Sequence, residues 1–152
     1  MSRRPLKNSN PFTPRPDFSI TILSQTQLLK MVVELTRHIA TLFHFSLAEA
    51  QKISLAIDEA VTNVIKHSYG NDPGQEIRID YFLADGGVRI RIFYRGLPPE
   101  ISDEEVNISR MIKKKKKGGL GVKLMKTIMD SVTYSTRNGE NCCEMTKWLK
   151  AK

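Results

Sequence analysis

The chain has 152 residues, of which 40% are hydrophobic, and it carries a formal net charge of +8. This length and composition suffice for one sizeable buried core, so we expect a single domain. No apolar run reaches the roughly 18 residues of a membrane-spanning helix, and the basic, proline-rich N-terminus lacks the apolar segment of a signal peptide, so neither is expected and the cytoplasm is the default compartment.

The positive charge favours acidic partners such as nucleotide phosphates, nucleic acid or an acidic protein, but it is unevenly placed. Residues 1–16 hold several basic residues among four prolines, which predicts a disordered basic tail followed by a domain over 17–152. Five consecutive lysines form the run Lys113 to Lys117. We interpret this run first as a solvated flexible segment, with a phosphate contact or binding to nucleic acid or an acidic partner as alternatives. No nucleic-acid-binding motif accompanies it, which argues against nucleic acid.

The first half of the domain predicts one strand and two helices. Apolar residues alternate with polar ones from Phe18 to Ile22, as in a short strand. Ser24 with Gln27, and Ser46 with Glu49, have the spacing of capping boxes, and apolar residues follow each pair at helical spacing. Helices are therefore expected from about residue 25 to 43 and from about 46 to the turn formers that begin at residue 70.

The second half predicts a hairpin, a long loop, a helix and a second hairpin. Two alternating segments, 77–83 and 88–94, flank a glycine-rich turn, and parity turns Tyr94 toward the interior. Residues 97–117 show no periodicity, which is typical of a functional or mobile loop. After a third amphipathic helix, Asn138-Gly139 predicts the turn of the last hairpin. The order predicts a two-layer α+β sandwich, with a mostly antiparallel sheet and helices on one face.

The two cysteines, Cys142 and Cys143, are adjacent within this last hairpin. A strand would turn them to opposite faces, which makes a mutual disulfide awkward and gives no support to a metal site. We expect two reduced thiols.

One stretch of the second helix, residues 55–69, carries side chains suited to chemistry. Glu59 and Asn63 lie four apart, so a carboxylate and a carboxamide stack on one side of the helix, at the flank of an apolar stripe. A carboxylate near a phosphate chain can act as a general base, and a carboxamide oxygen is a hard ligand suited to Mg²⁺. A solvated helix often carries the same pair without function, so the pair alone is a weak signal.

A second stretch, residues 117–125, places three glycines immediately before the third helix. Glycines let the backbone approach a ligand closely, and the free N–H groups of a helix start favour an anion. The stretch lacks the Gly-Lys-Ser/Thr ending of a P-loop, and a plain turn into a helix explains it about as well. Together with Glu59 and Asn63, however, it supplies the parts of a phosphoryl-transfer centre.

With both stretches in hand, the chain from about Phe18 to Leu149 resembles the anti-sigma factor serine-protein kinases of the RsbW and SpoIIAB type. These belong to the ATPase superfamily of histidine kinases, a heat-shock chaperone, MutL and gyrase. Residues 55–67 match the N-box of that family, and Gly118-Gly119-Leu120-Gly121, with the helix that follows, match its second glycine box.

The resemblance implies roles for these residues. Glu59 would be the catalytic base, Asn63 the Mg²⁺ ligand, Gly118, Gly119, Leu120 and Gly121 the phosphate cradle, and residues 97–117 a lid over ATP. It also implies a homodimer that binds a sigma factor and phosphorylates a serine on a STAS-domain anti-anti-sigma protein.

The chain departs from the family at the first glycine box. There the family has Asp-x-Gly, whose aspartate accepts a hydrogen bond from the adenine amino group, whereas this chain has Tyr94-Arg95-Gly96. Tyr94 and Gly96 would still border the adenine site, but no carboxylate is supplied. Two hypotheses follow: an ATP-dependent protein kinase with weakened nucleotide binding, and a partner-switching binding module on the same fold that no longer uses nucleotide. A third hypothesis, a nucleic-acid-binding protein, rests on charge alone.

Overall fold

The computed structural model describes residues 10–99 and 119–150. Its elements are β1 Phe18–Leu23, α1 Thr26–Leu42, α2 Leu47–Asn63, the π-helical turn η1 Val64–Ser68, β2 Glu76–Ala84, β3 Gly87–Tyr94, α4 Gly119–Ile128, β4 Ser131–Arg137 and β5 Glu140–Trp148. The predicted two-layer α+β sandwich is confirmed.

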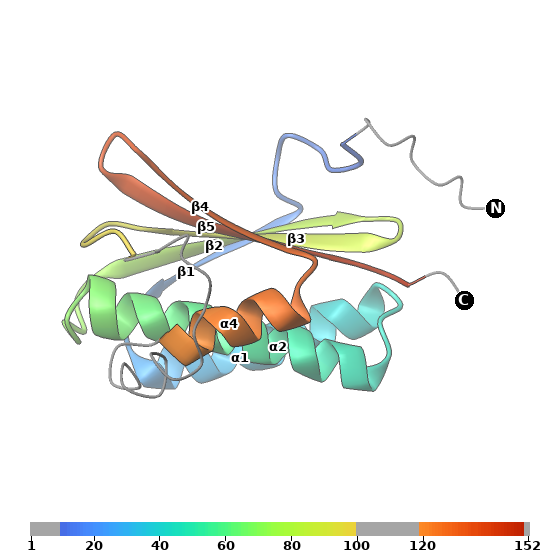
Figure 1. Cartoon of the computed structure of the whole chain (residues 1–152), viewed down its shortest axis with the longest axis horizontal. Coiled ribbons are helices and arrows are strands. Elements are labelled where there is room, and N and C mark those ends of the chain that lie inside the picture. Colours follow the sequence, from blue (N-terminus) through green and yellow to red (C-terminus); the bar gives the residue numbers. More distant parts are fainter. Residues whose placement is uncertain (1–9, 100–118, 151–152) are drawn as a thin grey trace.

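The five strands form one antiparallel sheet in the order β1-β2-β3-β5-β4. The α-helices α1, α2 and α4 lie on the same face of this sheet, and none of the described helices lies on the opposite face (Figure 1). Because side chains alternate along each strand, every strand has one set facing the helices and one set facing away from them. We call the second side the outer face.

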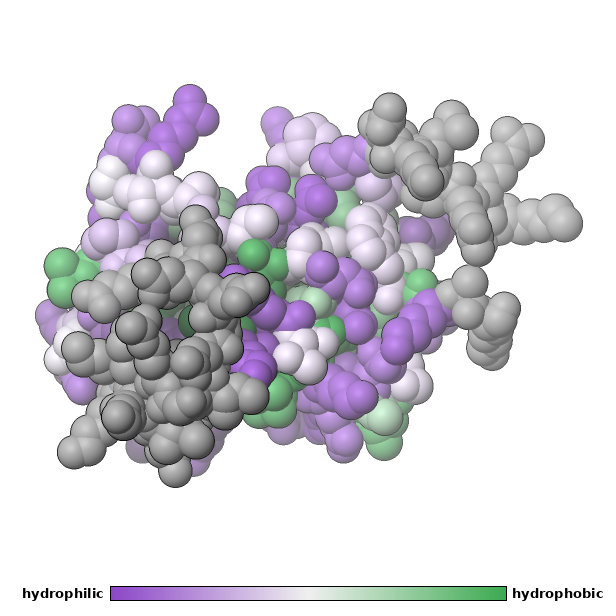
Figure 2. All heavy atoms as spheres, viewed as in Figure 1, coloured by the Kyte–Doolittle hydropathy of each residue, from purple (hydrophilic) through white to green (hydrophobic). Residues whose placement is uncertain are grey.

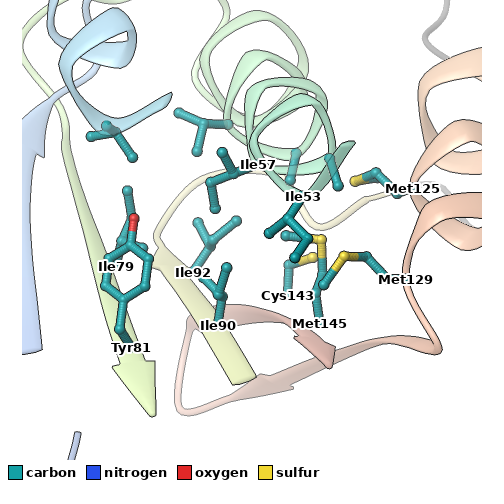
Figure 3. Close-up of a cluster of buried hydrophobic side chains, with 14 of the residues drawn as sticks. Ile53, Ile57, Ile79, Tyr81, Ile90, Ile92, Met125, Met129, Cys143 and Met145 are labelled. Carbon is teal, nitrogen blue, oxygen red and sulfur yellow. The ribbon is translucent and has the colours of Figure 1, made fainter. Parts of the chain in front are cut away.

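The core lies between the helices and the sheet (Figure 3). Isoleucines of α2, β2 and β3 meet methionines of α4 and β5 there. The largest fully buried side chains include Ile53, Ile57, Ile79, Ile90, Ile92, Met125 and Met145. Burying a side chain of this size contributes roughly 1.5–3 kcal/mol relative to leaving it in water, so this layer supplies most of the stabilisation.

The polar atoms in this core are satisfied. The Thr36 hydroxyl donates to the Val32 carbonyl (2.8 Å), so the Tyr81 hydroxyl, 2.7 Å away, donates to Thr36. Burial raises the pKa of Tyr81 to about 12. In the described part of the chain, no buried polar side-chain atom lacks a hydrogen-bond partner.

The predicted turns and one of the two caps are confirmed. Asn138 and Gly139 have φ of 52° and 75°, the left-handed pair that a two-residue hairpin requires. Ser46 Oγ accepts a hydrogen bond from the Glu49 N–H (3.1 Å) at the start of α2. The capping box proposed for Ser24 is wrong: its hydroxyl bonds to the turn before β2, donating to the Asp72 carbonyl and accepting from the Gln75 N–H.

The adjacent cysteines lie on opposite faces of β5, as strand parity predicts. Cys143 is buried in the core, and Cys142 is half-buried on the outer face. Burial raises the pKa of Cys142 to about 11 and that of Cys143 to about 12, so both thiols are protonated at neutral pH.

Residues 10–17 differ from the disordered tail expected up to residue 16. Phe12 is only 6% exposed, and its ring packs against Trp148 of β5 with centroids 5.4 Å apart. The Arg89 guanidinium lies 4.4 Å from the Phe12 ring centroid, a cation–π contact. This segment, which we call the strap, thus fastens to the outer face through one aromatic side chain.

The side of the molecule in Figure 2 is largely hydrophilic, with hydrophobic residues in small separate groups. Among the described helices, none has the length and apolar character needed to cross a membrane.

Candidate functional site

Glu59 and Asn63 lie on the last two turns of α2, on the flank predicted from their spacing. Both are half-buried, whereas Ala56, Ile57 and Ala60 on the neighbouring stripe face the core. The structure therefore holds these two polar side chains at the margin of the packed layer, where a ligand can reach them.

The structure brings these side chains to the glycines of the third helix. A Cβ built on Gly121 would lie 2.5 Å from Glu59 Oε2 and 3.5 Å from Asn63 Nδ2. Any residue but glycine would press on the Glu59 carboxylate, so the missing side chain keeps a space in which α2 and α4 meet. The carboxylate, the carboxamide and the start of α4 thus share one site.

The glycines themselves are placed differently from the expectation. The helix α4 begins at Gly119, so Gly119, Leu120 and Gly121 form its first turn rather than a loop before it. The first N–H groups of a helix have no partner within it and attract anions, so the start of α4 keeps the chemistry expected of a phosphate cradle. Gly118 lies outside the described residues.

Immediately after Asn63 the helix changes to a π-helical turn, η1. Its N–H bonds run backward by more than four residues, from Tyr69 to the Val64 carbonyl (2.9 Å) and from Asn71 to the Ile65 carbonyl (2.8 Å). Such turns are frequent at functional sites. The widened turn changes the helical phase after Asn63, and His67 within it is exposed.

Tyr94 points inward, as predicted, and is 3% exposed. Its ring meets the ring of Tyr69 edge to face at a centroid distance of 6.5 Å. Burial raises the pKa of Tyr94 well above its usual range, with a hydrogen bond to Ser68 as a smaller opposing effect. The side chain is therefore a neutral phenol at physiological pH and offers no negative charge to a ligand.

Gly96 follows this tyrosine and fits closely against the end of the helix. A Cβ at Gly96 would lie 2.5 Å from the Ser68 carbonyl oxygen, and φ of 118° also favours glycine. Asn141 holds the segment from the other side, donating to the Gly96 carbonyl (3.2 Å) and accepting from Thr136 (2.8 Å). Sequence reasoning missed Ser68 and Asn141, and only the glycine at position 96 signals such a close approach.

Comparison with known proteins identifies the family. A model of the histidine kinase-like ATPase domain matches residues 23–147. The chain belongs to this family.

Curated relatives within this family confirm the resemblance found in the sequence. The chain is 24% identical over 119 residues to serine-protein kinase RsbW of Bacillus subtilis, a match that covers 75% of this chain and 74% of the relative. It is 27% identical over 119 residues to serine-protein kinase RsbW of Listeria monocytogenes, with 75% of each chain covered.

Solved structures share the fold. The RsbU and RsbW domains of a Mycobacterium tuberculosis protein superpose with a TM-score of 0.62 at 19% identity, over 91% of this chain and 34% of that one. A chain of the SiaB–SiaC complex of Pseudomonas aeruginosa superposes with a TM-score of 0.55 at 11% identity, over 88% of this chain and 89% of that chain.

The ATPase domain family implies a nucleotide and a metal ion, and the residues present fit both. Within residues 10–99 and 119–150, no group of three or more His, Cys, Asp or Glu side chains forms a metal site. Magnesium, however, commonly takes only one or two protein ligands and completes its shell with phosphate oxygens and water. The Asn63 carboxamide would supply such a ligand, beside the space that Gly121 leaves and the N–H groups of α4. The greater part of the proposed lid, residues 100–117, and the lysine run lie outside the described residues.

Proposed function

We propose that this protein is an ATP-binding anti-sigma regulatory factor that acts as a serine/threonine protein kinase. The observation that carries the proposal is the meeting of Glu59, Asn63 and Gly121 at the start of α4. The named activity of its RsbW relatives supports the choice of protein kinase over the other reactions of the family.

Each residue has a task in that reaction. Mg²⁺ATP, when bound, supplies the phosphoryl group. The N–H groups at the start of α4 would hold phosphate oxygens, and the Asn63 carboxamide oxygen would be a ligand of the metal. With Mg²⁺ATP bound, Glu59 would accept the proton of the substrate serine hydroxyl as a general base, while the γ-phosphoryl group passes from ADP, the leaving group, to the serine oxygen.

The proposal extends to partners. We infer that the protein substrate is a STAS-domain anti-anti-sigma protein, that the second partner is a sigma factor, and that the protein works as a homodimer in the cytoplasm. The RsbW relatives support this reading of the partners.

A pair of neighbouring carboxylates allows a matched test of Glu59. Glu59→Gln keeps the size of the side chain but removes the base, so we expect phosphate transfer to a STAS-domain protein of the same genome to fall by about 10²- to 10⁴-fold. Mg²⁺ATP binding, measured by calorimetry, should persist. Asp58→Asn is the control, because Asp58 is also half-buried on α2 but faces Thr62 (3.4 Å). Equal rates for Glu59→Gln and the unaltered protein would remove Glu59 from the role of base.

Tyr94 favours a second candidate function, a partner-switching module that binds no nucleotide. In the sequence resemblance Tyr94 stands where the family has its adenine-binding aspartate, and its buried ring carries no charge at neutral pH. The same calorimetric titration decides between the candidates: binding at millimolar concentration or below supports the kinase, and no heat at any concentration supports the module.

Replacing Tyr94 then tests whether this residue weakens the binding of Mg²⁺ATP. Restoring a hydrogen-bonded carboxylate is worth about 1–3 kcal/mol, so Tyr94→Asp should tighten Mg²⁺ATP binding by about 5- to 150-fold. Tyr94→Ala is the control, since it removes the ring without adding an acceptor. An equal gain in both variants would show that the Tyr94 ring excludes adenine sterically. No gain in either variant would show that Tyr94 is not the cause of weak ATP binding. Circular dichroism checks that each variant is folded, because Tyr94 belongs to the core.

A further inference from the structure

The outer face of the sheet is divided into a covered half and an open half. The strap covers the first, where Phe12 packs over Arg89 and Trp148 and Thr146 beneath them is only 3% exposed. The open half lies over the other ends of β3, β5 and β4, away from the helices (Figure 1). None of the residues proposed to handle nucleotide projects from this half.

The open half contains a hollow of about 410 Å³. The strand register explains it: Cys142, Ser135 and Thr133 are neighbours across β5 and β4, and all three side chains are short. Longer side chains from β3 and from the turn of the last hairpin stand around them. The hollow is therefore built into the strand pattern and needs no movement of the backbone to form.

Positive charge exceeds negative charge around this hollow. Glu144 lies between two guanidinium groups, 2.5 Å from Arg91 and 3.6 Å from Arg89. Arg95, Arg137 and Glu140 line the opposite side, and Arg95 Nη1 would lie 3.7 Å from a Cβ built on Gly139. Arg89 itself lies under the strap, so three arginines and two glutamates line the hollow, and this excess of guanidinium groups favours an additional carboxylate.

The strand β4 forms one edge of the sheet beside the hollow, so one side of its backbone has no strand partner among the described elements. Proteins usually protect such edges with lysine, proline or a bulge. β4 has the sequence SVTYSTR, without proline or lysine, and pairs with β5 in unbroken register. Val132 and Tyr134, on its core-facing side, are only half-buried and leave apolar surface that another strand could cover.

We propose that the edge of β4 and the adjacent hollow dock an extended segment of a partner protein, which adds a sixth strand to the sheet. Alternate side chains of the segment face the two sides of the sheet. Those toward the hollow are acidic and meet Arg137 and the other arginines. Those toward the helices are apolar and cover Val132 and Tyr134. Backbone hydrogen bonds supply affinity in such strand addition, and the alternating side chains supply specificity.

This surface lies apart from the candidate nucleotide site. Glu59, Asn63 and Gly121 belong to the helical layer, whereas the hollow opens on the outer face of the sheet. A docked segment therefore leaves the helical layer open, and the proposal stands whether or not the protein binds nucleotide.

A seven-residue peptide of alternating glutamate and valine, with blocked ends, matches the length of β4 and serves as the probe. Titrated into the ¹⁵N-labelled full chain, it should shift the amide resonances of residues 131–137 and 142, and leave those of Glu59 and Asn63 in place. A peptide with the same composition in separate glutamate and valine blocks tests for non-specific charge attraction, and an alternating lysine–valine peptide tests for the sign of the charge. Both should bind at least about 10-fold more weakly.

Two variants with the same charge change locate the contact. Arg137→Glu should lower the affinity for the alternating glutamate–valine peptide by about 10-fold or more. Arg37→Glu, on α1 and far from the β4 edge, should change this affinity by less than about 2-fold. The proposal is overturned if the blocked or lysine peptide binds equally well, if the shifts fall outside β4 and β5, or if the two variants behave alike. It is also overturned if sedimentation and concentration-dependent shifts show that a second copy of this chain occupies the β4 edge.

Discussion

At the scale of single residues, Gly121 lowers the helix propensity of α4 but leaves room for the Glu59 carboxylate. Glycine inside a helix costs up to about 1 kcal/mol relative to alanine, yet it lies in the first turn of α4. An alanine Cβ would come within 2.5 Å of Glu59 Oε2, the mobile end of a flexible side chain. The carboxylate can rotate away from the new methyl group, so the substitution does not disrupt the helix. It does, however, displace Glu59 from its position in the candidate site.

Gly121→Ala should therefore separate stability from activity. We expect the free energy of unfolding in urea to stay constant or rise by up to about 1 kcal/mol, because helix propensity improves. Phosphate transfer should fall by about 10-fold or more, because Glu59 loses its position. Lys126→Ala, an exposed position on the same helix, is the control and should leave transfer unchanged. Unaltered transfer by Gly121→Ala would show that the place of Glu59 beside α4 has no part in the reaction.

Some of these residues were predictable from the sequence and others were not. Helical spacing placed Glu59 and Asn63 on one flank, and strand parity turned Tyr94 inward. Neither pattern predicts the distance between α2 and α4, because that distance depends on how the two helices pack. The fit of Gly96 against Ser68 likewise depends on where the long hairpin returns to the helix.

At the scale of elements, long-range bonds hold the end of α4 to the sheet. The buried Lys147 ammonium donates to the Ile128 carbonyl (2.8 Å) and lies 3.7 Å from a Glu49 carboxylate oxygen of α2. Asp130 accepts a bond from the Trp148 N–H (2.7 Å), and its own N–H donates to the Thr146 carbonyl (2.9 Å). These contacts fix α4 at the end away from Glu59, so the glycine turn is positioned from a distance.

Element positions followed from periodicity, whereas their ends required tertiary contacts. Every expected helix and strand is present, because apolar spacing of about 3.6 or 2 reports which face will be buried. Ser24 and Gln27 have the residue types of a capping box. The Ser24 hydroxyl instead makes its hydrogen bonds to a turn some 50 residues further along the chain. The π-helical turn after Asn63 has no sequence signature, since its hydrogen bonds depend on how the chain leaves the helix.

At the scale of the whole molecule, the sheet separates two surfaces. The helices lie on one side of the sheet and the strap on the other (Figure 1). The candidate nucleotide site belongs to the helical layer, and the hollow opens on the outer face. Composition predicted a disordered N-terminus because prolines and charges dominate it, whereas the structure packs one aromatic residue of this segment, Phe12, against Trp148. One side chain does not change the average composition, but it can anchor a short segment.

The anchoring by Phe12 can be measured with the only tryptophan in the chain, Trp148. Burying one phenylalanine is worth about 1.5–3 kcal/mol and the contact with Arg89 about 0.5–1 kcal/mol, but ordering the strap costs part of this. We therefore expect Phe12→Ala to lower the free energy of unfolding by about 1–2 kcal/mol. Trp148, now 37% exposed, should lose its cover, so its fluorescence should shift to the red and be quenched more strongly by acrylamide.

Leu42→Ala, on the exposed end of α1, is the control for stability and should change neither quantity appreciably. Mg²⁺ATP binding should be the same in all three proteins, because the strap and the helical layer lie on opposite sides of the sheet. Fluorescence that is unchanged in Phe12→Ala would mean that the strap does not rest on Trp148 in solution.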